Sequence, residues 1–203
     1  TPSVGFLLFP NSEVVDFAGP YEVFTTAARV SRRRTQNLIE PFRVFTVARD
    51  EQLVRARAGL EVKGDHILAL HPHIDVLIVP GGIVTAELEK PDIIEWIRHT
   101  SRNAQLTASV CTGSFLLAKA GLLEGKAATT HWEDTRDLRT MFPTISVVEQ
   151  TRWVDEGSIV TSAGIAAGID MSLHLVRRLA GQPLAEATAR QMDFQWGGAD
   201  YEG

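Results

Sequence analysis

Short apolar runs with high β propensity alternate with longer helical segments along almost the whole chain, and this alternation constrains the fold more than any other feature. The run at residues 4–9 is almost continuously apolar, as expected for a strand buried on both faces of a sheet. Strands are predicted at residues 4–9, 42–48, 75–79, 127–130 and in the run leading up to Cys111, and helices at residues 17–31, from Pro91, directly after Cys111, and at 133–141, 163–180 and 184–194. This order predicts an α/β fold around a mostly parallel central sheet.

Two further pairs of short strands are predicted. Residues 52–62 resemble one pair, and residues 151–154 and 158–161 flank Asp155-Glu156-Gly157, a strong hairpin signal. The chain has no internal repeat, low-complexity segment or linker, and 203 residues suffice for a substantial core. We therefore expect residues 1–203 to form a single domain.

Composition narrows the function classes. Hydrophobic residues make up 44% and charged residues 22%, and the net charge of −5 argues against nucleic acid as a main partner of this chain alone. No apolar stretch approaches the ~20 residues that span a bilayer, and the N-terminus lacks a signal-type core, so no membrane association is expected. A single cysteine cannot form an internal disulfide, which favours a reducing, cytoplasmic location. The basic cluster Arg32-Arg33-Arg34 is interpreted as a solvated helix end, with an anion or effector site as the alternative.

The only cysteine, Cys111, lies between an apolar strand-forming run and a helix-forming run, in Ser109-Val110-Cys111-Thr112-Gly113-Ser114. A residue on such a strand-to-helix corner projects at the end of the sheet, as in a nucleophile elbow. The Thr112 amide and the first turn of the next helix would face the sulfur and lower the pKa of the thiol. A buried structural cysteine is the alternative. The context favours a nucleophile.

Two other segments are predicted to lie at the same edge of the sheet. Pro80-Gly81-Gly82 follows a strand, where open α/β sheets form their ligand crevice. The amides of Gly81 or Gly82, together with that of Thr112, could form an anion hole, or the segment could be a plain tight turn. Asp16 is placed in the loop between the first strand and the first helix, where a helix-capping role is the simplest alternative.

Four motifs in order resemble the DJ-1/PfpI superfamily, and within it the isocyanide (isonitrile) hydratase branch. They are residues 15–20 (Val-Asp-Phe-Ala-Gly-Pro), 79–82 (Val-Pro-Gly-Gly), 109–114 around Cys111, and 128–132 (Ala-Thr-Thr-His-Trp). The resemblance implies a flavodoxin-like, three-layer α/β sandwich with a mostly parallel central sheet and a nucleophile elbow. It also implies a homodimer with the active site near the dimer interface, and no cofactor.

The resemblance assigns chemistry to these residues. Many members of the superfamily carry Glu where this chain has Asp16, and hydratase-like members carry Asp. A carboxyl beside the sulfur has a raised pKa and could donate a proton to a reacting carbon. Cys111 would attack the terminal carbon of a small isocyanide, Asp16 would supply the proton, and Thr112 would hydrogen-bond the carboxyl or the attacking water. The product would be an N-substituted formamide, which makes the chain a lyase.

Several other histidines, glycines and tryptophans are not expected to take part in catalysis. Thr112 stands where protease-like members carry His, which argues against a Cys-His protease triad. His131 is expected to be structural or to line the pocket wall, together with Gly164 and Ile165. The glycines of residues 163–170 lack the spacing of a phosphate loop, and His71-Pro72-His73 is a weak ligand set, so neither nucleotide nor metal is expected. Trp132, Trp153 and Trp196 are interpreted as core or interface aromatics.

Two other functions stay open from the sequence. Relatives of this domain form the sensor halves of AraC-type transcription regulators, which carry additional C-terminal residues with two helix-turn-helix motifs, whereas this chain ends at Gly203. In that case the same pocket would bind an effector without turnover. The third possibility is a redox or stress-responsive DJ-1-like protein whose cysteine is oxidised. Asp16 in place of Glu counts modestly against this third function.

Overall fold

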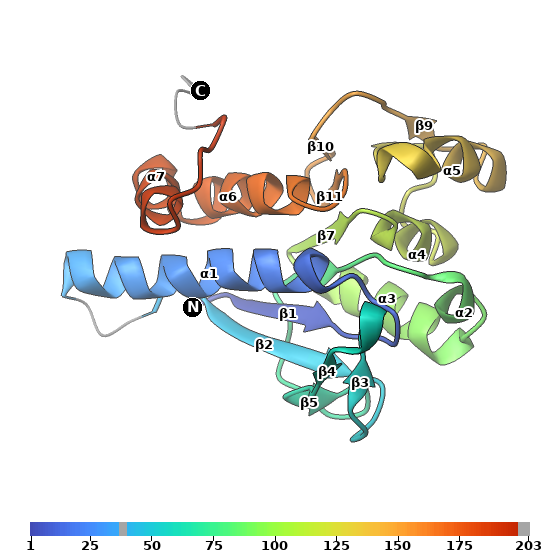
Figure 1. Ribbon diagram of the computed structural model, residues 1–203, viewed down its shortest axis with the longest axis horizontal. Coiled ribbons are helices and arrows are strands. Elements are labelled where there is room, and N and C mark those ends of the chain that lie inside the picture. The colour runs from blue at the N-terminus through green and yellow to red at the C-terminus, as the bar shows by residue number, and fades with distance from the viewer. Residues whose placement is uncertain (37–39, 199–203) are drawn as a thin grey trace.

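The computed structural model describes residues 1–36 and 40–198 and shows a seven-stranded sheet in the order β10-β11-β7-β6-β1-β2-β5 (Figure 1). Every neighbouring pair in this sheet is parallel except β10 and β11, which form an antiparallel hairpin at one edge. The strands of the sheet are β1 (Ser3–Leu7), β2 (Arg43–Ala48), β5 (His66–Ile67), β6 (Val76–Val79), β7 (Leu106–Val110), β10 (Trp153–Asp155) and β11 (Ile159–Ser162). The predicted α/β fold with a mostly parallel central sheet is confirmed.

Helices cover both faces of the sheet, giving three layers. One apolar core contains side chains of α1, α6 and α7, which lie side by side in the left half of Figure 1, and the other contains side chains of α3, α4 and α5. The helices are α1 (Val14–Thr35), α2 (Thr85–Leu88), α3 (Pro91–Asn103), α4 (Gly113–Lys119), α5 (Thr135–Met141), α6 (Ala167–Ala180) and α7 (Gln182–Gln191), with short 3₁₀ turns η1 (Arg57–Gly59) and η2 (Trp132–Asp134).

Strand β1 explains why the sequence gives this arrangement. Its side chains and those just after it alternate between the cores: Val4, Phe6 and Leu8 pack on the α1 side, whereas Leu7 and Phe9 pack on the other side. All five are at most 1% exposed. A run that is apolar at every position, rather than at alternate positions, therefore reports a strand covered on both faces.

Two small sheets lie outside the central one. Strands β3 (Val54–Arg55) and β4 (Glu61–Val62) form an antiparallel pair, as residues 52–62 predicted. Strands β8 (Ala127–Ala128) and β9 (Ser146–Val147) pair in parallel. The strand predicted at residues 127–130 is therefore shorter than expected and does not join the central sheet.

The order of the strands reverses at β1, which lies between β2 and β6. The chain leaves β1 and β6 in opposite directions across the sheet, so a crevice opens at the carboxyl ends of these strands. An isolated bridge between Ser12 and Gly82 ties the two loops together at this point. The nucleophile elbow after β7, the strand next to β6, lies at the same edge.

Three surface expectations can be compared with the structure. The cluster Arg32-Arg33-Arg34 occupies the exposed last turn of α1, as a solvated helix end would. Trp196 is buried, whereas Trp132 is 76% exposed and is not a core residue, so an interface role for Trp132 stays a prediction. Within residues 1–36 and 40–198, no helix combines the length and apolar character needed to cross a membrane.

Candidate active site

Cys111 occupies a strained corner between β7 and α4. Its φ angle is 56°, in the left-handed region that residues with a side chain seldom adopt. The surrounding main chain holds this conformation: the Cys111 amide donates to the Ser162 oxygen at 3.1 Å, and the Cys111 oxygen accepts from the Thr130 hydroxyl at 3.0 Å. Strain of this kind persists only where neighbouring contacts over-determine it, and it concentrates at functional sites.

Asp16 lies in the first turn of α1 rather than in the preceding loop, because α1 begins three residues earlier than predicted. Glu13 occupies the N-cap position, and no side chain caps this helix. The carboxyl of Asp16 is fully buried, and its Oδ2 accepts a hydrogen bond from the Gly81 amide at 3.0 Å. Its Oδ1 has no partner of ordinary hydrogen-bond geometry among the residues that the structure describes. A capping role for Asp16 therefore does not explain its position.

Burial raises the pKa of Asp16 to about 7, and the nearby Glu13 carboxylate adds to this increase. The Gly81 amide and a hydrogen bond with the Cys111 thiol oppose the increase but are outweighed. Asp16 is thus a carboxyl that can both accept and release a proton near neutral pH, as a general acid-base group requires.

The thiol differs from the sequence-based expectation. Burial, followed by the charge of Asp16, raises the pKa of Cys111 to about 12, although hydrogen bonds from Thr112 partly oppose this. The expected lowering of the pKa of Cys111 is wrong, because the sulfur is in a poorly solvated position next to the Asp16 carboxyl. Near neutral pH the resting pair is therefore a protonated Cys111 thiol beside an Asp16 carboxyl group that exchanges its proton readily.

Thr112 and the two glycines are more constrained than predicted. The Thr112 hydroxyl donates to the Gly82 oxygen at 2.8 Å and accepts from the Gly82 amide at 2.9 Å. Its proton is therefore not available for the Asp16 carboxylate, although its second lone pair can still accept from a water. The amides of Gly81 and Gly82 are occupied by Asp16 and Thr112, so they do not form the expected anion hole. The Thr112 amide remains the main-chain donor to the sulfur.

The close approach of these segments requires glycine at position 81. A Cβ atom placed on Gly81 would lie 2.5 Å from the Thr112 nitrogen and 2.6 Å from its Oγ1 atom, well inside contact distance. The Pro80-Gly81-Gly82 segment thus works as a spacer that brings the elbow, Asp16 and the loop after β6 into contact.

A cavity of about 590 Å³ opens onto Cys111 and Thr112. His131 and Ile165 line it, and the Cβ that Gly164 lacks would fall 2.9 Å from the Cys111 sulfur and against the His131 ring. The Nδ1 atom of His131 accepts from the Glu133 amide at 3.2 Å, which fixes the ring at the wall. The residues expected on the pocket wall, His131, Gly164 and Ile165, therefore all lie beside the cysteine.

Four lining residues were not singled out from the sequence: Glu13, Arg57, Glu133 and Asp134. Arg57 comes from the turn between β3 and β4 and pairs with Glu13 at 3.2 Å. Glu133 and Asp134 lie two and three residues after His131, so their proximity to the pocket could have been suspected from that residue. Arg57 gives no such signal, because only the tertiary fold brings its turn to the site.

Other regions offer weaker chemistry. A cavity of about 580 Å³ between β10, α6 and the segment 194–198 contains the Arg152–Asp170 ion pair but no nucleophile. Within the described part of the chain, no group of three or more His, Cys, Asp or Glu side chains is placed to hold a metal ion.

The fold and site define an α/β protein with a cysteine at a nucleophile elbow and a carboxyl group beside it. The chain belongs to the DJ-1/PfpI family, which matches residues 2–178. Among solved structures, a ThiJ/PfpI family protein from Pseudomonas syringae is similar over 96% of this chain and 75% of that one, with a TM-score of 0.83 and 27% identity. DJ-1beta of Drosophila melanogaster shares the fold, with a TM-score of 0.81 at 21% identity over 97% of this chain and all of that one.

Curated relatives fall into two groups. The isonitrile hydratase of Pseudomonas putida is 35% identical over 94% of this chain and 78% of that protein. The HTH-type transcriptional regulator CdhR of Pseudomonas aeruginosa is 33% identical over 92% of this chain, which spans only 53% of the regulator. Family membership is therefore shown, and it includes both an enzyme and regulators.

Proposed function

We propose that this protein is a cysteine-dependent hydratase that converts a small isocyanide to an N-substituted formamide. The observation that carries the proposal is the fully buried Asp16 carboxyl, whose pKa is raised to about 7, beside the Cys111 thiol at the base of a cavity. The 35% identity to an isonitrile hydratase supports the same reaction. A homodimer in the cytoplasm, expected from the family resemblance and the lone cysteine, is part of this proposal.

The first half of the reaction needs one proton and one nucleophile. As the Cys111 sulfur bonds to the terminal carbon of R–N≡C, the thiol proton passes to the Asp16 carboxylate. Asp16 then gives that proton to the same carbon, which yields the thioimidate R–N=CH–S–Cys111. A carboxyl with a pKa near ambient pH suits both transfers. A thiol at rest therefore does not prevent attack, since its proton is the one that the carbon requires.

Water completes the cycle. It adds to the thioimidate carbon, one of its protons goes to the nitrogen, and its oxygen stays on the carbon. Collapse of this adduct breaks the carbon–sulfur bond, returns the other proton to the sulfur and releases R–NH–CHO. Asp16 can relay these protons as well, and no cofactor is consumed.

A ligand-sensing role is the second candidate, supported by the similarity to GbdR and CdhR. In that case the cavity would bind an effector without turnover. The two roles differ in one respect, because only a hydratase needs Asp16 to exchange a proton. A redox role is less well supported, because a thiol 7% exposed with a pKa raised to about 12 is a poor target for peroxide.

The proposal is tested by measuring formamide production from a panel of alkyl and aryl isocyanides, with the wild-type protein and Asp16→Asn. We expect turnover by the wild type and a rate lower by about 10²–10⁴-fold for Asp16→Asn. Saturable binding of isocyanides without any product from the wild type would overturn the hydratase and favour the sensor.

A further inference from the structure

Acidic side chains outnumber basic ones in the lining of the Cys111 cavity. Three carboxylates line the cavity, on Glu13, Glu133 and Asp134, against the single guanidinium of Arg57. Arg57 is already paired with Glu13 at 3.2 Å. Within the described residues, Glu133 and Asp134 have no lysine or arginine partner, and their carboxylates lie 4.0 and 3.5 Å from the Nδ1 atom of His131. The cavity is therefore electronegative on the side of η2.

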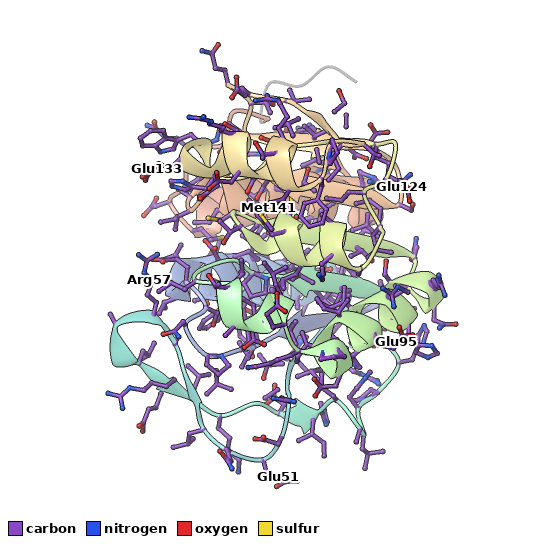
Figure 2. All side chains as sticks on the ribbon, turned by 90° about the vertical axis from the view of Figure 1, so that its right-hand side faces the viewer. Glu51, Arg57, Glu95, Glu124, Glu133 and Met141 are labelled. Atoms are coloured by element: carbon purple, nitrogen blue, oxygen red, sulfur yellow. The ribbon has the colours of Figure 1, made fainter. Side chains whose placement is uncertain are left out.

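The positions of these groups place the excess charge at the entrance. The side chain of Glu133 is 64% exposed and that of Asp134 is 35% exposed, whereas Cys111 is 7% exposed. Figure 2 shows Glu133 and Arg57 on the same side of the molecule, Glu133 above Arg57. The two carboxylates thus lie at the solvent-exposed side of the cavity lining, and the cysteine lies at its buried side.

The interior of the cavity adds a second observation, an unpaired hydrogen-bond acceptor. Beside Cys111, the Oδ1 atom of the fully buried Asp16 has no hydrogen-bond partner of ordinary geometry among the described residues. Burial and the neighbouring Asp137 and Glu133 carboxylates raise the pKa of Asp134, and His131 only partly opposes this. The negative charge is thus concentrated at the entrance, whereas the Asp16 carboxyl beside the sulfur, with a pKa of about 7, is only partly ionised near neutral pH.

We infer that this cavity selects substrates with a positively charged substituent, and that Glu133 and Asp134 are the residues that determine this preference. The inference rests on the proposed function and adds its substrate class: an isocyanide with a short apolar stem that ends in an ammonium group. The stem would pass Ile165, the apolar residue in the cavity lining, and the ammonium group would stay near the two carboxylates at the entrance. Carboxylate-bearing isocyanides are repelled.

A pocket lined by charges of one sign concentrates counter-ions and raises association rates by 10–10³-fold, an effect that salt weakens. We therefore expect kcat/KM for an ammonium-bearing isocyanide to exceed that for a carboxylate-bearing isocyanide of equal length by at least about tenfold at low salt. The neutral alkyl analogue should lie between them.

The test needs a measurement that does not depend on hydratase activity. The rate of chemical modification of the single cysteine, Cys111, provides one. Two methanethiosulfonate reagents, one carrying a trimethylammonium group and one a sulfonate, form mixed disulfides with Cys111 and release the same methanesulfinate. The rate with the trimethylammonium reagent is divided by the rate with the sulfonate reagent. Dividing this ratio by the same ratio for a small free thiol removes the intrinsic difference between the reagents and leaves the charge preference of the cavity. We expect a corrected ratio of about ten or more for the wild type. It should approach one in the double variant Glu133→Gln/Asp134→Asn and in high salt.

Two single variants serve as controls. Glu124→Gln removes an exposed carboxylate that lies on the opposite side of the view in Figure 2 and should leave the ratio unchanged. Arg57→Gln leaves Glu13 without its partner and should increase the ratio. A wild-type ratio near one, or a ratio that the double variant does not change, overturns the charge preference even if isocyanides are hydrated. A large ratio without hydration would instead refute the hydratase and leave the cationic ligand class in place.

Discussion

The Thr112 hydroxyl and the Gly82 main chain are hydrogen-bonded in both directions, at 2.8 and 2.9 Å. This reciprocal pair connects the nucleophile elbow to the loop after β6. Its removal should leave the Gly82 amide and carbonyl without these partners next to the elbow. We predict that Thr112→Val lowers the free energy of unfolding by about 1–3 kcal/mol. Thr112→Ser keeps the hydroxyl and should lie close to the wild type in chemical denaturation, and equal losses in both variants would refute the role of the hydroxyl.

Asp16 should make stability depend on pH. Its pKa is raised from 3.8 to about 7 in the folded protein, so the native state holds a proton that the unfolded chain releases between these values. The contribution of Asp16 is therefore intact below about pH 4 and is lost as the pH rises through 7, at a cost of about 4 kcal/mol when the carboxyl is ionised. We predict that Asp16→Asn gains stability relative to the wild type as the pH rises from 4 to 7, with no further gain above about 8. Denaturation curves at several pH values measure this, and a difference independent of pH would contradict it.

Gly164 keeps space open between the sulfur and the His131 ring. A Cβ at this position would lie 2.9 Å from the Cys111 sulfur, so Gly164→Ala must displace one of its neighbours. We predict slower alkylation of Cys111 and a free energy of unfolding lower by about 1–3 kcal/mol. Gly197→Ala is the matched control, because a Cβ there meets nothing within 4 Å. Alkylation at the wild-type rate in Gly164→Ala would show that this glycine does not shape the site.

The parts of the fold that the sequence predicts are those with strong local signals. The apolar runs at β1 and β6, the hairpin around Gly157 and the strand-to-helix corner at Cys111 are all found in the structure. The start of α1 was predicted three residues late, because Asp16 was placed in the loop before a helix at residues 17–31, where a capping role was the alternative, whereas α1 begins at Val14. In the structure Pro20 lies inside α1.

The sequence predicted which residues lie close together at the site more successfully than which hydrogen bonds they form. The order of motifs brings Asp16, Gly81, Cys111 and Thr112 to one edge of the sheet, but it cannot show which donors are already used. The Gly81 amide is bonded to Asp16 and the Gly82 amide to the Thr112 hydroxyl, so these two amides do not form the expected anion hole, and the Thr112 hydroxyl proton is bonded to Gly82 rather than to Asp16. The direction of the Cys111 pKa was also wrong, because burial depends on packing from several elements. The position of Arg57 at the cavity was not predicted either, because it too depends on how separate elements pack.

The central claim is that the Cys111 sulfur forms the bond to the substrate carbon. Its most direct test is formamide production by Cys111→Ala, in protein shown by circular dichroism and thermal unfolding to be folded, against wild type under identical conditions. The account predicts steady turnover by the wild type, no product above the uncatalysed rate for Cys111→Ala, and a mass increase on Cys111 equal to the isocyanide in acid-quenched wild-type samples. Turnover by Cys111→Ala at the wild-type rate would contradict it.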